Sequence, residues 1–235
     1  MRVIVGMETS GRTRTAFELL GHDVVSVDLL PADDGAPNHI QADVFDVLSQ
    51  ERFDLGIFHP TCTYLTISAE WCYKDNPGKN MTPGVLFGAE RREARERALE
   101  DFKRLDRHPN VKRKAIENPV GVVSTRHRRP DQIVQPYQFG DDASKKTCLW
   151  LTGLPPLKID PAQAVAPRWI CCGLDLGQRM TSPGCPICGS HYKALPRWAN
   201  QNDSGQNREA PSADRWKNRS ATFPGIAAAF AKNWG

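Results

Sequence analysis

The sequence lacks any run of about 18 or more apolar residues, and its first residues turn polar too early for the apolar stretch of a secretory signal peptide. It also lacks a strong excess of either charge, so its net charge of +4 neither identifies nor excludes an anionic partner. No internal repeat of about 20–50 residues is visible, which excludes solenoids and propellers. We therefore expect a soluble, cytoplasmic protein with no membrane partner.

Cysteine is scarce outside one short segment. The chain has seven cysteines, an odd number, of which four lie between Cys171 and Cys188, while Cys62, Cys72 and Cys148 are widely separated. Such an uneven distribution is a poor framework for disulfides and indicates a metal site plus free thiols in a reducing compartment.

Apolar segments alternate with helical patterns along the first part of the chain. We predict strands at 3–6, 24–28, 53–58, 113–116 and 147–151, and helices at 15–21, 89–107 and 224–231. The alternation predicts an α/β fold, with a mostly parallel sheet and helices on both faces. The length suits one large domain with an appendage. We expect a domain over 1–153, a small metal-containing insert over 154–219, and a returning C-terminal helix in 220–235.

The turn after the first strand is a candidate ligand site, formed by Met7-Glu8-Thr9-Ser10-Gly11. In an open α/β sheet, ligands bind beyond the carboxyl ends of the strands, where turns lead into helices. Asp28, followed by Leu29, ends the second strand, and its carboxylate can accept hydrogen bonds from ribose hydroxyls. Asp43, followed by Val44, is placed to bind an adenine amino group. The alternative for Asp28 is that it only caps a local turn.

A cysteine follows the strand at 53–58, in the turn His59-Pro60-Thr61-Cys62. A free cysteine is most often a small core side chain, but beyond a strand end and beside a ligand pocket it stands where a covalent nucleophile would. Glu117 is placed at the tip of another predicted strand, before Asn118 and Pro119. Because strand ends share one edge of the sheet, we expect Cys62 and Glu117 to lie close together.

In chain order, the turn at 7–11, Asp28, Pro60-Thr61-Cys62 and Glu117-Asn118-Pro119 resemble the motifs of S-adenosylmethionine-dependent cytosine-C5 DNA methyltransferases, especially the short bacteriophage forms. The resemblance covers about residues 1–150 and the tail. It implies a Rossmann-like class I methyltransferase fold, a cofactor site for S-adenosylmethionine that includes Pro60, and a cytosine flipped out of DNA as substrate.

The resemblance also implies roles for two side chains. Cys62 would attack C6 of cytosine while Glu117 contacts N3 and the exocyclic amine, which makes C5 nucleophilic enough to accept a methyl group. Loss of the C5 proton would then expel Cys62. The sequence departs from the family pattern at Thr61 and Pro119, where the family has proline and valine, and in the missing first glycine of the cofactor loop.

Several polar and basic residues are candidates for substrate binding. Asn118 and Pro119 belong to the Glu117 motif, and Lys145, Lys146 and Thr147 are the nearest counterpart of an arginine-rich family strand. Arg126 and Arg128 flank Glu117, where a polyanion would pass. Arginines and tryptophans around the cysteine cluster suit phosphate contacts and base stacking, or else pack on the metal unit.

The cysteine cluster consists of Cys171-Cys172 and Cys185-Pro-Ile-Cys188-Gly. The second half has the spacing of a zinc knuckle, and we predict a structural Zn²⁺ held by all four cysteines. His191 could replace one of the first two. A redox pair formed by Cys185 and Cys188, or unligated thiols, are the alternatives.

Two other functions remain open at the level of the sequence. The same chemistry could act on a free deoxycytidine nucleotide, or with an analogue of S-adenosylmethionine, because the recognition region is short. The chain could instead be a non-catalytic nucleic-acid-binding protein on this fold. However, a binding-only protein has no physical need for either Cys62 or Glu117.

Overall fold

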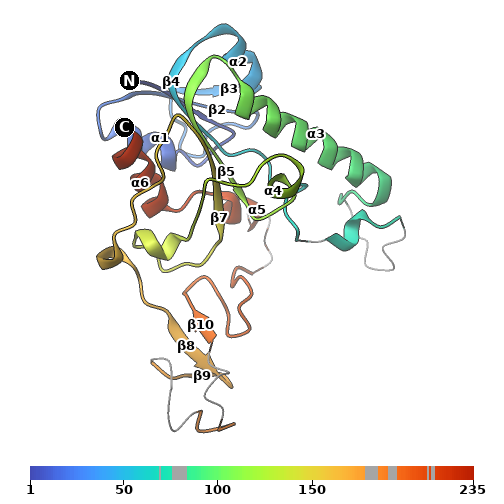
Figure 1. The fold of residues 1–235 in the computed structure, drawn as a ribbon, viewed down its shortest axis with the longest axis vertical. Coiled ribbons are helices and arrows are strands. Elements are labelled where there is room, and N and C mark those ends of the chain that lie inside the picture. Colours follow the sequence, from blue (N-terminus) through green and yellow to red (C-terminus); the bar gives the residue numbers. More distant parts are fainter. Residues whose placement is uncertain (69, 76–83, 178–184, 190–194, 211, 213–214) are drawn as a thin grey trace.

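The computed structural model describes residues 1–235 except 69, 76–83, 178–184, 190–194, 211 and 213–214. The described residues form a seven-stranded sheet in the order β3-β2-β1-β4-β5-β7-β6 (Figure 1). Its strands are β1 (Arg2–Gly6), β2 (Asp23–Asp28), β3 (His39–Gln41), β4 (Phe53–Phe58), β5 (Val111–Pro119), β6 (Gln132–Val134) and β7 (Thr147–Thr152). Among these strands only β7 runs against the others. The prediction of an α/β fold with a mostly parallel sheet is confirmed.

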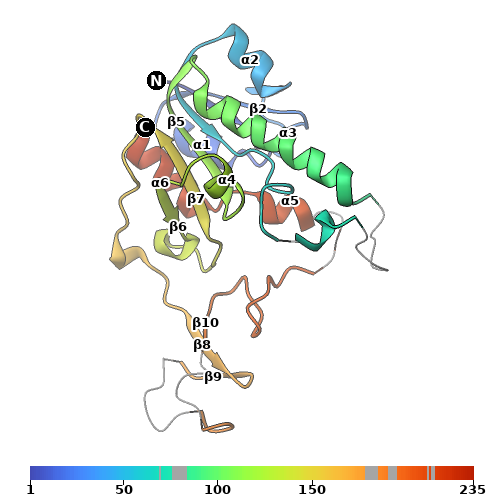
Figure 2. The ribbon, with the colours of Figure 1, turned by 45° about the vertical axis from the view of Figure 1, so that its right-hand side comes forward.

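Helices cover both faces of the sheet (Figure 2). They are α1 (Arg12–Glu18), α2 (Val44–Gln50), α3 (Gly88–Arg107), α4 (Val123–Arg126), α5 (Arg215–Ser220) and α6 (Pro224–Trp234), with short 3-10 turns η1 (Glu70–Tyr73), η2 (Pro136–Phe139) and η3 (Pro161–Gln163). Successive strand residues point to opposite faces, so Ile4 packs with α2 and α3, whereas Val3 and Val5 pack with α1 and α6.

A buried lysine of β5 binds the C-terminal end of the long helix α3. Lys114 Nζ donates to the carbonyls of Leu105, Asp106 and His108 at 3.2, 3.0 and 2.8 Å. Burial lowers the pKa of Lys114, an effect that nearby Asp106 opposes. These carbonyls at the helix C-terminus have no partner within the helix, so a cation satisfies them well. Lys114 is therefore a cap of α3 and no part of a nucleic-acid surface.

Two expected boundaries were wrong. Helix α1 begins at Arg12 and ends at Glu18 instead of spanning 15–21, because Gly11 at φ 69° starts the helix and Gly21 at φ 79° lies in the turn beyond it. Strand β5 continues through Glu117, Asn118 and Pro119, which were expected just past a strand ending at 116. The reason is the antiparallel neighbour β7, which extends the hydrogen-bonded ladder to the end of β5.

The cysteine-rich part of the chain forms a second, smaller sheet. Its described strands, β8 (Arg168–Cys171), β9 (Leu174–Asp175) and β10 (Leu195–Arg197), pair in the order β10-β8-β9. We call the described residues of 168–197, which are 168–177, 185–189 and 195–197, the finger, since they project away from the seven-stranded sheet (Figure 1). Leu157, within the expected insert at 154–219, is instead buried in the core of the large sheet. The chain therefore leaves the large domain only after this residue.

A glycine after β5 lets the loop that carries Cys62 approach closely. Gly121 bridges Thr66, and a Cβ added at Gly121 would lie 2.0 Å from the carbonyl oxygen of Leu65. We expect Gly121→Ala to lower the free energy of unfolding by about 2–3 kcal/mol, because the loop must move away from β5. Urea unfolding measures the loss.

Gly21→Ala is the matched control for that substitution. Gly21 has a left-handed φ of 79°, which Gly121 does not, and a Cβ at Gly21 would meet nothing within 4 Å. Its expected cost is only the conformational one, about 1 kcal/mol. A Gly121→Ala protein that loses no more stability than Gly21→Ala would contradict the close approach.

Candidate functional site

Two of the predicted loops meet where the strand order reverses. Strand β1 lies between β2 and β4, so the chain turns one way after β1 and the other way after β4. Ligands bind at such a switch point in open α/β sheets. The backbone N–H of His59, just after β4, donates to the carbonyl of Gly6 at the end of β1, at 3.0 Å. The turn at 7–11 and the Cys62 loop thus share one edge of the sheet.

The turn after β1 contains a buried acid with spare hydrogen-bonding capacity. Glu8 Oε1 accepts from Ser10 Oγ at 2.6 Å and from the backbone N–H of Thr13 at 3.3 Å. Its Oε2 and the hydroxyl of Thr13 have no hydrogen-bond partner among the described residues. Met7 at φ 63° and Gly11 at φ 69° bend the turn sharply. Since an unpaired buried oxygen is costly, Glu8 is suited to accept a hydrogen bond from a bound molecule.

The two predicted ligand-binding aspartates also have structural roles. Asp28 Oδ1 accepts from the backbone N–H of Leu30 at 2.9 Å, and partial burial raises the pKa of this carboxyl. Asp43 caps α2 by accepting from the N–H of Phe45 at 2.8 Å. Leu29 is exposed, whereas Val44 is buried in the core. Both aspartates therefore accept a local backbone hydrogen bond, and each has a second carboxylate oxygen with which to bind a ligand, so their role as cofactor ligands stays a prediction.

The loop after β4 holds Cys62 half-buried, with a free thiol. Asn118 Nδ2 donates to the carbonyl of the buried Pro60 at 2.8 Å, and the N–H groups of Leu65 and Thr66 donate to the carbonyl of Cys62 at 3.1 and 3.0 Å. Burial raises the pKa of the Cys62 thiol, and the positive charge of Lys145 opposes that rise. The loop is thus fixed through its backbone, which leaves the sulfur available for chemistry.

Glu117 lies buried on β5, facing the same loop. Its Oε2 is 3.2 Å from Nδ1 of His59. Burial tends to raise the pKa of Glu117, but the hydrogen bond with His59 and the charge of Lys145 outweigh it and lower the pKa. Cys62 and Glu117 interact electrostatically with each other and with Lys145. A narrow pocket beside Glu117 is lined by Lys145, Thr147, Thr222, Phe223 and Ile226.

The structure separates the predicted substrate-binding residues into two groups. Lys145 lies at the site, with its Nζ donating to the carbonyl of Arg219 at 3.2 Å, and it is followed by the exposed Lys146 and the buried Thr147. Asn118 and Pro119 are in β5, next to Glu117. All five belong to the strands or loops that surround the pocket.

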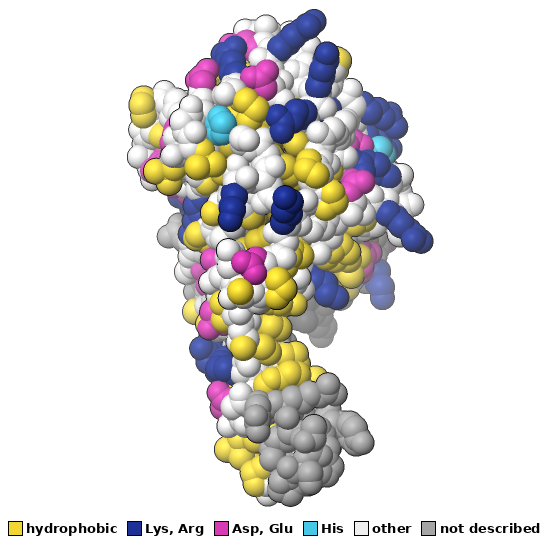
Figure 3. Space-filling model, turned by 60° about the vertical axis from the view of Figure 1, so that its left-hand side comes forward, with side chains coloured by type: hydrophobic (Ala, Val, Ile, Leu, Met, Phe, Trp, Pro, Cys, Tyr) yellow, Lys and Arg dark blue, Asp and Glu magenta, His cyan; other side chains and the backbone are white. Residues whose placement is uncertain are grey.

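Arg126 and Arg128 are not free cations, contrary to the prediction of a basic surface flanking Glu117. Arg126 pairs with both oxygens of Glu96 at 2.7 Å, and Arg128 pairs with Asp106 at 3.0 Å and Asp131 at 2.6 Å. Figure 3 likewise shows basic side chains dispersed among acidic and apolar ones on the face that it displays. Their charge is already neutralised, which weakens them as phosphate ligands.

Three contributors to the site were not recognised in the sequence. His59 contacts Glu117, Thr222 Oγ1 lies 3.4 Å from Nδ1 of His59, and the charge of Arg219 acts on Cys62. The position of His59, directly after a buried strand and before Pro60, could have predicted that it belongs to the site, because the site is formed by residues at strand ends. Arg219 was expected only among the residues that contact phosphate, and Thr222 only in the segment that leads into the returning C-terminal helix, so neither was expected beside Cys62 or Glu117.

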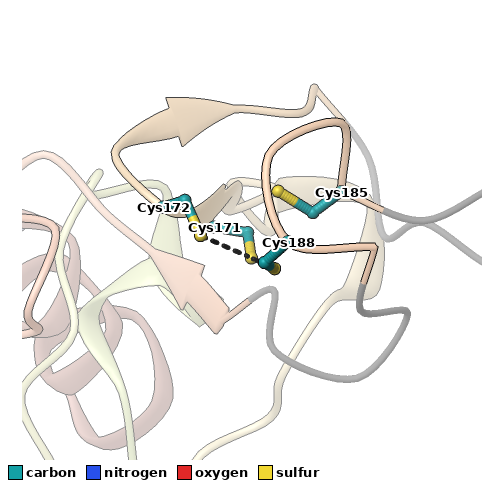
Figure 4. Close-up of side chains that lie close together, drawn as sticks. All are labelled: Cys171, Cys172, Cys185 and Cys188. Carbon is teal, nitrogen blue, oxygen red and sulfur yellow. Dashed lines mark hydrogen bonds between the residues drawn. The ribbon is translucent and has the colours of Figure 1, made fainter.

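The finger brings all four predicted metal ligands together. The sulfurs of Cys171, Cys172, Cys185 and Cys188 lie within 4.8 Å of one another, and those of Cys171 and Cys188 are 3.7 Å apart (Figure 4). Tetrahedral zinc with bonds of about 2.3 Å needs sulfurs about 3.8 Å apart. The four cysteines could therefore hold a zinc ion. His191, the alternative ligand, lies outside the described residues.

Local backbone geometry explains why adjacent cysteines can share a site. Neighbouring strand residues normally point to opposite faces, but Cys172 at φ 51° and Gly173 at φ 77° turn the chain sharply after β8. On the other side, the backbone N–H groups of Cys188 and Ile187 hydrogen-bond to Cys185 and lower the pKa of its thiol to about 7. A thiol that ionises easily is a better metal ligand.

The base of the finger is anchored next to Lys145. The Ser144 N–H donates to Asn200 Oδ1 at 2.9 Å, and Asn200 Nδ2 donates back to the Ser144 carbonyl at 3.0 Å. Trp198 stacks on Tyr137 with ring centres 4.3 Å apart. The finger is thus joined to the segment that supplies the cation of the pocket.

No described helix is both long and apolar enough to span a bilayer. Comparison with models of known protein families gives no match to the chain, and comparison with curated proteins gives none either.

Proposed function

We propose that this protein is a methyltransferase that transfers a methyl group from S-adenosylmethionine to C5 of cytosine in DNA. The observation that carries the proposal is the placement of Cys62 and Glu117 at one edge of a doubly wound sheet, with Lys145 acting on both. A thiol and a carboxyl are the two groups that activation of cytosine C5 requires.

Each side chain has a defined part in the chemistry. The Cys62 thiolate forms a bond to C6 of the base, while the Glu117 carboxylic acid gives a proton to N3. The positive charge of Lys145 favours the thiolate, against the burial that raises the pKa of Cys62. After methylation, C5 loses its proton to water and N3 returns its proton to Glu117, which restores the C5–C6 double bond and releases the sulfur of Cys62 as a thiolate.

S-adenosylmethionine, when bound, supplies the electrophilic methyl group. The residues that would hold it are Glu8 and the rest of the turn at 7–11, together with Asp28 and Asp43. The unpaired Oε2 of Glu8 fits a ligand with hydrogen-bond donors, and so do the second oxygens of the two aspartates. These acceptors suit the amino group and the ribose hydroxyls of such a cofactor, and they support the proposal on chemical grounds.

DNA as the substrate is supported by the cations of the pocket and by the finger. Lys145 and Arg219 act on the pocket from the segments before β7 and at the end of α5. The finger, with zinc held by four cysteines, is joined beside this pocket through Asn200. We propose that the finger contacts the duplex near the flipped-out cytosine.

A mechanism-based trap tests the proposal. Purified protein is incubated with S-adenosylmethionine and a duplex that contains 5-fluoro-2′-deoxycytidine, and in parallel with the matching free nucleotide. Fluorine at C5 blocks the final elimination, so we expect the protein to form a denaturation-resistant adduct with the duplex. Peptide mapping should place this adduct at Cys62. An adduct with the nucleotide alone would replace DNA by a free nucleotide as substrate. DNA binding without any adduct would favour a non-catalytic protein.

A further inference from the structure

His59 is a buried side chain that the proposed chemistry does not yet use. Its side chain is 8% exposed and follows β4, three residues before Cys62. Nδ1 lies 3.2 Å from Oε2 of Glu117 and 3.4 Å from the hydroxyl of Thr222. Within the described part of the chain, Nε2 has no hydrogen-bond partner. Nδ1 and Glu117 Oε2 can form a hydrogen bond only if one of these two atoms carries a proton.

We propose that His59 is a positioning residue for Glu117: its Nδ1–H donates to Oε2 and leaves Oε1 as the oxygen that carries the proton for N3 of the base. This inference rests on the proposed function. As the bond between Cys62 sulfur and C6 forms, the proton moves from Oε1 to N3, and it returns to Oε1 when that bond breaks. His59 keeps its own proton throughout and stabilises the carboxylate left behind.

The surroundings of Glu117 single out His59 as the partner that orients it. Lys145 acts on Glu117 through its charge. Among the described residues, the thiols of Cys62 and Cys148 also interact electrostatically with Glu117. Burial is the main cause that raises the pKa of Cys148, to about 11, and the negative charge of Glu117 adds to it. The thiol of Cys148 therefore stays neutral. A charge attracts both carboxylate oxygens from a distance, whereas a directed N–H bond distinguishes one from the other.

The direct test is the titration of Glu117 in the folded protein without substrate. Its carboxyl carbon is followed by NMR in glutamate-labelled protein and assigned through Glu117→Gln. In His59→Ala the midpoint should rise by about one pH unit, because the hydrogen bond to the carboxylate is lost. In His59→Asn, whose amide nitrogen can take the place of Nδ1, the midpoint should stay within a few tenths of a unit of wild type.

His127→Ala is the matched control, because His127 also contacts a carboxylate but is not among the residues that line the pocket beside Glu117. Its Nε2 lies 2.7 Å from Asp106 Oδ2. We expect the Glu117 midpoint to be unchanged in this variant. The proposal would be overturned if Glu117 titrated with the same midpoint in wild type and in His59→Ala. It would also be overturned if His127→Ala shifted the Glu117 midpoint as much as His59→Ala does.

Turnover supplies a second readout. Any limb of the pH–rate profile that reports protonation of the Glu117 carboxyl should lie about one pH unit higher in His59→Ala than in wild type. The maximal rate should fall about tenfold or more, and His59→Asn should recover most of it. Wild-type turnover in His59→Ala, despite a shifted titration, would exclude the positioning role. The expected titration shifts in a protein that never methylates cytosine would support the His59–Glu117 contact and refute the proposed function.

Discussion

Replacing Cys62 with alanine is expected to abolish methyl transfer while the protein remains folded and binds S-adenosylmethionine with unchanged affinity. The loop around Cys62 is held by its backbone carbonyl and by the bond between Asn118 and Pro60, and alanine preserves both. Only the nucleophile is lost, and removal of a covalent nucleophile typically costs roughly 10⁴-fold or more in rate. Rates with duplex DNA, thermal melting and calorimetric titration of the cofactor measure the three expectations.

Cys72→Ala is the control for the loss of a thiol. Cys72 is buried in η1 and is not among the residues that line the pocket beside Glu117, and its truncation should lower stability by about 1 kcal/mol with activity retained. If Cys62→Ala kept more than a tenth of the wild-type rate, covalent catalysis by this residue would be refuted.

Removal of zinc is expected to unfold the finger and leave the seven-stranded sheet intact. The described apolar core of the finger is small: Cys171 and Cys185 are buried, and only Trp169 and Leu176 pack against them. So little apolar burial cannot offset the entropy of ordering the finger. Structural zinc contributes about 10–16 kcal/mol of binding free energy in comparable peptides, so a zinc ion held by the four cysteines would be the main source of the finger's stability.

Hydrogen exchange after chelation measures this expectation. Amides of β8 and β10 should lose protection, whereas those of β1, β4 and β5 should retain it. A Cys185→Ser/Cys188→Ser protein should already show the unprotected finger, bind no stoichiometric zinc, and respond no further to chelator. Unchanged protection of the wild-type finger after complete metal removal would show that the cysteines are not a structural zinc site.

The parts of the site that follow from local sequence were predictable. Parallel strands place their carboxyl ends together, so the meeting of Cys62 and Glu117 at one edge followed from the strand pattern. The cysteine spacing likewise predicted the cluster of four sulfurs. The full length of β5 was not predicted because its last residues belong to the strand only through pairing with β7. The sequence of β5 alone does not show this pairing.

Long-range pairs of charged side chains could not be predicted in the same way. Arg126 and Arg128 find Glu96 and Asp106 on α3 only because α3 packs beside the segment that follows β5. The contact between His59 and Glu117 joins residues 58 positions apart and depends on the pairing of β4 with β5. Each such pair depends on tertiary packing, and local patterns do not encode it.

The two ends of the finger are attached at one place, so the finger could be replaced by another one as a unit. The chain enters it where the Val165 N–H donates to the Tyr137 carbonyl at 2.9 Å, and it leaves at Trp198, whose Nε1 donates to the Val165 carbonyl at 3.1 Å. Entry and exit are thus tied to each other and to the same 3-10 turn, η2. A finger of different sequence could be grafted between these two points without disturbing a strand of the large sheet. In the proposed DNA methyltransferase, the surface that contacts DNA could therefore change in evolution while Cys62 and Glu117 stay the same.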